Sequence, residues 1–264
     1  RAGPLDDCAA ARDRASSHYC DSHAVTAARA EKFGAQPRII FSLGGSSLQL
    51  IHTIYQPPGA GPYPTILTLH GRGANAFDLL GLAPYVCGGK FLLICPQAPL
   101  ETPIGPDATG YAWYSMSQGG VMDIAGMLSS QQQLQNFLDE CLERYAIDLS
   151  KLVVLGFSQG GVMAYSLALA NPERFTALVA LSCWLPQELA PRLNIGAAVQ
   201  SLPTLIQHGT QDPQIEIDRA RDSVARLREL KVPLTFKEYE MGHEIRPRGL
   251  MDLSAWLDKN FGAR

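Results

Sequence analysis

Residues 151–161 read Lys-Leu-Val-Val-Leu-Gly-Phe-Ser-Gln-Gly-Gly, and this stretch decides the fold. The apolar residues 152–155 are typical of a strand buried on both faces, and residues 162–170 are good helix formers. A Gly-x-Ser-x-Gly turn between a strand and a helix predicts a nucleophile elbow with Ser158 at its tip. We expect side chains at the two glycine positions of this turn to collide with the neighbouring strand or helix. We also expect a strained backbone at Ser158.

The order of the elements around this turn predicts a doubly wound, mostly parallel α/β sheet. A Gly-Gly-Ser-Ser turn at 44–47 predicts a hairpin, which would form an antiparallel edge of the sheet. A long Pro- and Gly-rich loop is expected over 96–120. The predicted strands are 38–43, 48–55, 65–69, 91–95, 152–155, 177–181, 204–207 and 234–239, and the predicted helices are 76–86, 123–144, 162–170, 217–230 and 250–261.

Composition excludes several classes of partner. The chain has 264 residues, 46% of them hydrophobic, which suits a large α/β domain with a buried core. A net charge of −3 and a pI of about 6.1 give no electrostatic reason to bind nucleic acid or an anionic membrane. No apolar run approaches the roughly 18 residues of a membrane span, so no stable membrane association is expected.

The N-terminal part of the chain differs from the rest. Residues 1–36 are predicted to form an extension, with one or two short helices in 7–33, and residues 37–264 to form the catalytic domain. The role of the extension stays open between a lid over the active site, a surface appendage and a homodimer contact. Cys8 and Cys20 fall in this polar stretch, and a disulfide between them would indicate a secreted or periplasmic protein. Without that disulfide, a cytoplasmic location is favoured.

Metal binding is not expected. Cys8, His18, Cys20 and His23 lie close together in the chain, but their spacing fits no common zinc pattern. The other cysteines sit in or beside apolar segments and are predicted to be buried free thiols. They are Cys87, Cys95, Cys141 and Cys183.

A serine nucleophile needs a general base, and the base needs an orienting acid. In the predicted fold these residues follow the order Ser, acid, His, each just past the end of a strand. Asp212 follows the strand that ends near His208, and His243 follows the strand 234–239. We therefore predict a triad of Ser158, Asp212 and His243. Glu240 and Glu244, which flank the histidine, are weaker alternatives for the acid.

The oxyanion of an acyl-transfer reaction needs backbone donors. One donor in this fold is the N–H after the nucleophile, here Gln159, and the other lies in the loop after an early strand. His70-Gly71-Arg72-Gly73 occupies that position, so the N–H of Arg72 is predicted as the second donor. Gly71 is expected to let the main chain approach the substrate.

The motifs together resemble the phospholipase/carboxylesterase family, the α/β-hydrolase group that includes bacterial carboxylesterases and acyl-protein thioesterases. The resemblance covers about residues 38–264 and rests on five motifs in order: His70-Gly-Arg-Gly, Trp113-Tyr114, Gly156-Phe-Ser-Gln-Gly-Gly161, His208-Gly-x-x-Asp212-Pro and Gly242-His-Glu-Ile245 with Pro247. It implies the same triad and the same oxyanion donors. It also implies activity on carboxylic esters, lysophospholipids or thioesters without a cofactor. The loop 96–120 departs from the thioesterase members, which argues against an acyl-protein substrate.

The combined expectation is a serine carboxylesterase for short- to medium-chain esters, with a small-molecule ester as its partner. The short stretch 159–211 leaves no room for a large cap domain, so an open site is predicted, with Trp113 and Tyr114 on its wall. The alternatives are a lysophospholipase or acyl thioesterase, or a peptidase or polyester hydrolase on the same fold. A non-catalytic binding protein is disfavoured because all three triad residues are present.

Overall fold

The computed structural model describes residues 38–42, 49–117, 120–193 and 195–261. The predicted extension 1–36, with Cys8 and Cys20, and the predicted turn at 44–47 lie outside the described residues. In the part of the chain that is described, no helix combines the length and the apolar character needed to cross a membrane.

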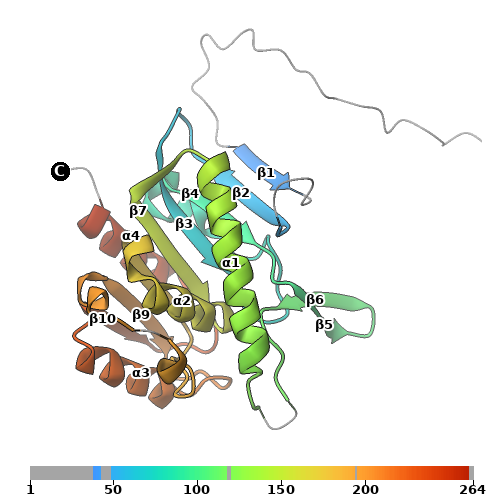
Figure 1. The fold of residues 1–264 in the computed structure, drawn as a ribbon, viewed down its shortest axis with the longest axis vertical. Coiled ribbons are helices and arrows are strands. Elements are labelled where there is room, and N and C mark those ends of the chain that lie inside the picture. Colours follow the sequence, from blue (N-terminus) through green and yellow to red (C-terminus); the bar gives the residue numbers. More distant parts are fainter. Residues whose placement is uncertain (1–37, 43–48, 118–119, 194, 262–264) are drawn as a thin grey trace, which may run out of the picture. The chain divides into compact units, whose positions relative to one another are not determined.

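An eight-stranded sheet runs through the described residues in the order β1-β2-β4-β3-β7-β8-β9-β10 (Figure 1). Six neighbouring strands of this sheet are parallel to one another: β4, β3, β7, β8, β9 and β10. Strand β2 instead pairs antiparallel with both β1 and β4. The predicted parallel sheet with an antiparallel edge is therefore confirmed. Its strands are β1 (Arg38–Ser42), β2 (His52–Gln56), β3 (Tyr63–Leu69), β4 (Leu92–Pro96), β7 (Ile147–Phe157), β8 (Ala177–Leu181), β9 (Thr204–Gly209) and β10 (Leu234–Tyr239).

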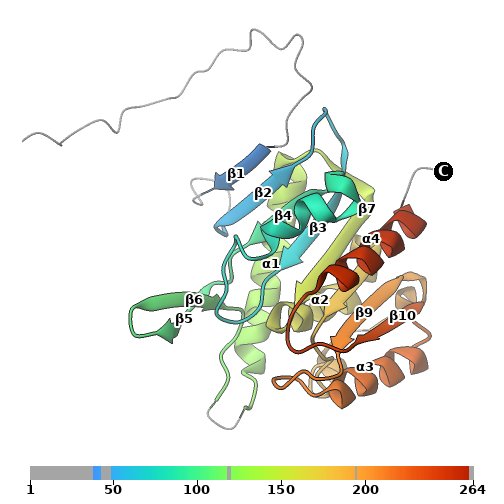
Figure 2. The same cartoon turned by 180° about the vertical axis from the view of Figure 1, so that it is seen from behind.

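Helices cover both faces of the sheet. Helices α1 (Ile124–Arg144), α2 (Gln159–Ala170) and α3 (Ile217–Glu229) contribute to one hydrophobic cluster. Helix α4 (Pro247–Phe261) and the 3-10 segment η1 (Leu79–Tyr85) contribute to a second cluster. The two views show α1 and α2 in front of the sheet and α4 behind it (Figures 1 and 2).

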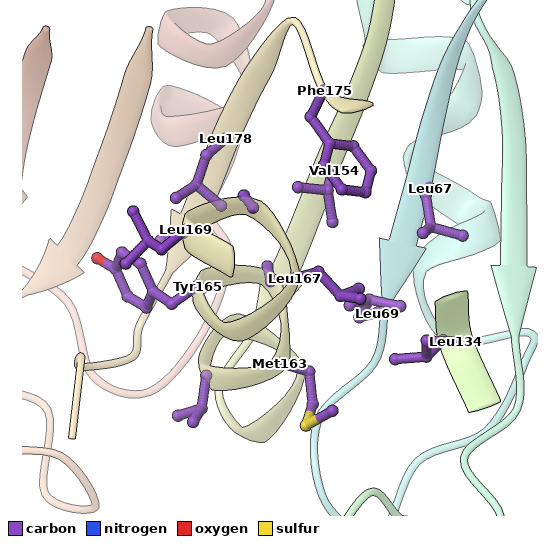
Figure 3. Packing of buried hydrophobic residues seen from close by; sticks show 14 of the residues in the cluster. Leu67, Leu69, Leu134, Val154, Met163, Tyr165, Leu167, Leu169, Phe175 and Leu178 are labelled. Carbon is purple, nitrogen blue, oxygen red and sulfur yellow. The ribbon is translucent and has the colours of Figure 1, made fainter. Parts of the chain in front are cut away.

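The continuous apolar run 152–155 in strand β7 is explained by burial on both faces of the sheet. Successive side chains of a strand point to opposite faces, so Leu152 and Val154 join the first cluster while Val153 and Leu155 join the second. Helix α2 is buried along almost its whole length because it packs against β7 and β8 and also contacts α1. Figure 3 shows Met163 and Leu167 of α2 among Val154, Leu69 of β3 and Leu134 of α1.

Two predicted segments were wrong. The segment predicted as a helix at 76–86 forms the 3-10 helix η1 instead, with Pro84 inside it. Proline has no N–H to donate and disfavours the α-helical conformation in the residue before it, so a regular α-helix cannot continue there.

The predicted loop 96–120 contains a hairpin, β5 (Leu100–Gly105) paired antiparallel with β6 (Ala108–Ala112). This hairpin forms a small sheet of its own, and most of its side chains are exposed. Its residues therefore lack the apolar pattern by which a buried strand is recognised.

Candidate active site

Ser158 occupies a sharp turn between β7 and α2. Its backbone has φ 53° and ψ −120°, a strained conformation for a residue with a side chain. A β-carbon on Gly156 would lie 2.1 Å from the carbonyl oxygen of Gly160, and one on Gly160 would lie 2.0 Å from that of Leu69. The predicted strain and both predicted collisions are confirmed, because the turn brings the backbones of β3, β7 and α2 into direct contact.

Asp212 and His243 meet at the carboxyl ends of β9 and β10. The Nδ1–H of His243 donates to Oδ2 of Asp212 over 2.7 Å. The other carboxylate oxygen of Asp212 accepts the backbone N–H groups of Gln214 and Ile215, each at 2.9 Å. The side chain of Asp212 is fully buried and that of His243 is 8% exposed. In the neutral tautomer that this bond favours, Nε2 of His243 is the acceptor.

Ser158 and His243 both line a cavity of about 340 Å³. Its volume lies within the range of small-molecule sites. The ring of Phe157 packs against the imidazole of His243, with centroids 4.9 Å apart. The cavity is lined by Gly71, Arg72, Tyr114, Met116, Phe157, Ser158, Gln159, Trp184, Gln214, Ile215, Arg219 and His243.

The 70–74 loop after β3 is held beside Ser158 by His70. The backbone N–H of Ala98 donates to Nε2 of His70 at 3.0 Å, so the proton sits on Nδ1 and is donated to the carbonyl of Gly71 at 2.7 Å. Burial lowers the pKa of His70 to about 4, although the hydrogen bond to Gly71 opposes the shift. His70 is therefore a neutral structural residue at neutral pH.

The hairpin holds the other side of the same loop. The N–H of Gly73 donates to the carbonyl of Tyr111 on β6 at 2.8 Å, and the N–H of Tyr111 donates to the carbonyl of Ala74 at 2.9 Å. A β-carbon on Gly110 would lie 1.9 Å from the carbonyl oxygen of Gly73. The strand β6 thus approaches the loop so closely that only glycine fits at position 110.

Hydrogen bonds of Gln159 and Trp113 connect the start of α2 to residues 113–114 and to the 70–74 loop. The side chain of Gln159 accepts the backbone N–H of Trp113 and donates to the carbonyl of Tyr114, both at 2.8 Å. The indole N–H of Trp113 donates to the carbonyl of His70 at 2.9 Å. Trp113 was expected on the wall of the site, but it is not among the residues that line the cavity. It is buried, and its indole is bonded to the 70–74 loop at His70. Tyr114 does line the cavity.

The ring of His243 bonds to Asp212 and not to either alternative acid. Glu240 is exposed at the surface, and Glu244 pairs with Arg246 at 2.7 Å. His208 donates from Nε2 to the carbonyl of Ile215 at 2.8 Å and lies 3.5 Å from Oδ2 of Asp212. Burial lowers the pKa of His208, so the ring beside Asp212 is neutral at neutral pH.

Several residues that line the cavity were not predicted. Phe157 was visible inside the Gly-x-Ser-x-Gly motif, but the motif alone did not show its contact with His243. The others come from separate loops and carry no motif: Met116, Trp184, Gln214, Ile215 and Arg219.

The described cysteines are buried free thiols, as predicted. Burial raises the pKa of the Cys95 thiol to about 11 and that of Cys87 to about 12, which leaves them protonated and poorly nucleophilic. Among the described residues, no three His, Cys, Asp or Glu side chains gather where they could hold a metal ion.

Known proteins are consistent with this geometry. An elbow serine at the carboxyl edge of a parallel sheet, followed along the chain by an acid and a histidine, defines the α/β-hydrolase fold. A family model described as Phospholipase/Carboxylesterase matches residues 52–261, so the chain belongs to this family and is a serine hydrolase that acts on carboxylic ester bonds.

The chain is 25% identical over 238 residues to acyl-protein thioesterase 1 of Mycosarcoma maydis, which covers 80% of this chain and 98% of the relative. It is 28% identical to acyl-protein thioesterase 1 of Gibberella zeae, over 74% of this chain and 89% of the relative. Two solved structures share the fold. The Bacillus cereus carboxylesterase matches with a TM-score of 0.66 and 21% identity, over 86% of this chain and 96% of that one. The Mesorhizobium loti carboxylesterase matches with a TM-score of 0.69 and 18% identity, over 84% and 98%.

Proposed function

We propose that this chain hydrolyses short- to medium-chain carboxylic esters, with Ser158 as nucleophile, His243 as general base and Asp212 as the orienting acid. The observation that carries the proposal is the 2.7 Å hydrogen bond from His243 Nδ1 to Asp212, beside a cavity that both Ser158 and His243 line. The bond keeps the proton of the neutral ring on Nδ1, so Nε2 is free to accept the proton of the serine.

The proposed reaction has two halves. His243 takes the proton of Ser158 as the hydroxyl attacks the ester carbonyl, and then gives it to the departing alcohol, which leaves an acyl-serine. His243 next takes a proton from water, which attacks the acyl-serine. The serine regains its proton from His243 as the acid leaves. The carboxylate of Asp212 stabilises the imidazolium that forms in each half.

The N–H groups of Gln159 and Arg72 are the proposed donors to the oxyanion. Gln159 is the first residue of α2, so its N–H has no acceptor within the helix and lies at the positive end of the helix dipole. Arg72 lies between Gly71, whose added β-carbon would come 3.4 Å from Cβ of Ser158, and Gly73, which is bonded to β6. These two contacts support a backbone N–H of Arg72 within reach of an ester bound at Ser158.

The size of the site supports a short or medium acyl chain. The cavity measures about 340 Å³. Between Ser158 and Asp212, the described residues 159–193 and 195–211 form α2, β8, β9 and short 3-10 turns, with no inserted cap domain. A site without a cap is open, and a cavity of this volume accommodates a small ester.

A lysophospholipase or acyl thioesterase is the second candidate. It is favoured by the curated relatives, which are named acyl-protein thioesterases. The same three residues would perform the reaction, since a thioester carbonyl is attacked in the same way and only the leaving group differs.

Initial rates on p-nitrophenyl esters from acetate to palmitate, for the native chain and Ser158→Ala, test the proposal. We expect a maximum at short or medium acyl chains and a fall in kcat of roughly 10⁴-fold or more in the variant. A maximum at palmitate would favour the second candidate. Activity that survives in a folded Ser158→Ala variant would disprove the proposed nucleophile.

A further inference from the structure

Among the described residues that line the cavity, the charged side chains are both arginines. Arg72 and Arg219 line it together with His243, and no aspartate or glutamate side chain is among its lining residues. The protein as a whole carries a net charge of −3, so this lining is opposite in sign to the rest of the molecule. A cavity lined by one sign of charge raises the local concentration of ligands of the other sign.

Arg219 is held in place by an aromatic ring. Its guanidinium carbon lies 3.8 Å from the centroid of the Trp184 ring, and Trp184 is only 9% exposed. Stacking uses the face of the guanidinium and leaves its N–H groups free around the edge. These N–H groups form a fork that matches the two oxygens of a carboxylate or phosphate.

The position of Arg219 is not explained by the stability of its helix. It lies in the first turn of α3, where the positive end of the helix dipole disfavours a cation. Other arginines of α3 have evident structural roles. Arg221 pairs with Asp218 at 3.0 Å and with Glu238 at 2.9 Å, and Arg226 donates to the carbonyl of Leu185 at 2.9 Å.

The nearby carboxylates do not neutralise Arg219 directly. Glu188 and Asp222 line a second hollow of about 160 Å³ that Arg219 and Trp184 also border. Among the described residues, however, neither acid forms an ion pair with Arg219. Arg219 therefore borders the cavity that holds Ser158, and no carboxylate among the described residues forms an ion pair with it.

We infer that Arg219 binds an anionic group of the substrate, and that the enzyme prefers esters that carry a carboxylate or phosphate apart from the bond that is cleaved. This inference rests on the proposed function, because the reaction must take place at Ser158. Arg219 is then a specificity-determining residue, and the anion takes no part in the chemistry.

The test compares ester pairs that differ in one anionic group, with hydrolysis followed in a pH-stat. Monoethyl adipate against ethyl hexanoate places the carboxylate on the acyl side. Butyrylglycolate against 2-hydroxyethyl butyrate places it on the alcohol side. Butyrylglycerol phosphate against butyrylglycerol supplies a phosphate. The measured quantity is the ratio of kcat/KM for the anionic ester to that for its neutral partner.

In the Arg219→Gln variant we expect this ratio to fall about tenfold or more for at least one pair, chiefly through KM, because a charge-assisted hydrogen bond is lost. Arg219→Lys should give an intermediate ratio, since lysine keeps the charge but loses the fork and the stacking. Added salt should lower the ratio in the native enzyme and have little effect on it in Arg219→Gln, because the site is exposed and screened.

Arg228→Gln is the matched control. Arg228 is exposed in the last turn of the same helix and does not line the cavity. Because each variant loses one arginine, Arg228→Gln and Arg219→Gln have the same net charge. Its ratio should equal that of the native enzyme. Equal falls in both variants would show a long-range effect of net charge and overturn the inference.

The pairs also identify the anion. A fall for the phosphate pair alone assigns the site to a phosphate, and a fall for a carboxylate pair also shows on which side of the ester the anion lies. An unchanged ratio in all pairs for Arg219→Gln, with hydrolysis still dependent on Ser158, overturns this inference alone. Hydrolysis that persists in Ser158→Ala overturns the proposed function instead.

Discussion

Asp212 uses its two carboxylate oxygens for different purposes. Oδ1 accepts the N–H groups of Gln214 and Ile215, which fix the orientation of the carboxylate, and Oδ2 faces the ring of His243. The orientation is thus set by two rigid backbone donors and does not depend on another flexible side chain. This arrangement makes the effect of an isosteric substitution predictable.

Asp212→Asn should inactivate the enzyme without unfolding it. The amide oxygen must face the two backbone donors, so the NH₂ group would point at His243 Nδ1 and force the ring proton onto Nε2. A ring protonated on Nε2 cannot accept the proton of Ser158, so kcat should fall roughly 10³- to 10⁴-fold. Steady-state kinetics with a melting curve measures this. A fall of only a few-fold in a folded variant would show that Asp212 is not the orienting acid.

His70 gives the protein a defined sensitivity to acid. Its pKa is lowered by burial from 6.5 to about 4, so the unfolded chain binds the proton more readily than the folded one. The stability that depends on this difference is complete above pH 6.5. It is lost as the pH falls from about 6.5 to about 4, and amounts to about 3 kcal/mol. Protonation would also compete with the hydrogen bond from Ala98.

The measurement is the free energy of unfolding in urea between pH 7 and pH 4, for the native chain and His70→Gln. The variant should be less stable at pH 7 but should lose less stability on acidification. His52 and His208, whose pKa values burial also lowers, are present in both proteins and cancel in the comparison. His70→Asn provides a second variant if glutamine is not tolerated. Parallel pH curves for the native and variant proteins would contradict the assignment.

At the scale of elements, the β5–β6 hairpin acts as a support for the 70–74 loop. It lies outside the main sheet and projects beside α1 (Figures 1 and 2). Its contacts with the loop are backbone hydrogen bonds through Gly73, Ala74 and Tyr111. Trp113 follows β6 directly, and its indole N–H donates to the carbonyl of His70 in the 70–74 loop.

Gly110→Ala should therefore damage the reaction from a position outside the cavity. The added methyl group would lie 1.9 Å from the carbonyl oxygen of Gly73, so β6 must move away from the loop. If the N–H of Arg72 is displaced with it, kcat should fall by roughly 10²- to 10³-fold, the effect of losing one oxyanion donor. Gly105→Ala on the same hairpin is the control, because its methyl group would meet only Ala108 at 3.8 Å. Equal kcat values for the two variants would contradict the supporting role.

At the scale of the whole molecule, the site lies along one edge of the sheet. Ser158, Asp212 and His243 follow β7, β9 and β10, whose carboxyl ends lie together because the strands are parallel. Ligands of open parallel sheets bind at this edge. The described lining of the cavity comes from segments between Gly71 and His243 along the chain.

We propose that residues 1–36 are an extension and that the hydrolase domain functions without it. Deletion of 1–36 should leave kcat/KM on p-nitrophenyl esters and the melting temperature unchanged, since the family match covers 52–261. The acyl-length profile of the shortened chain is the decisive measurement. A changed length preference would indicate a lid, and a lower melting temperature would show that the extension contributes to folding.

The sequence by itself determined the order of the strands of the main sheet and of the four α-helices, the elbow at Ser158 and its two obligatory glycines. It did so because burial on both faces of a strand and the steric limits of a tight turn are recorded in consecutive residues. Parallel pairing also allowed Asp212 and His243 to be placed at the same edge. Only the tertiary structure decided that Trp113 is buried, that the hairpin supports the 70–74 loop and that Arg219 stacks on Trp184 beside the cavity. These contacts join residues from separate loops, and their distances depend on how the whole core packs.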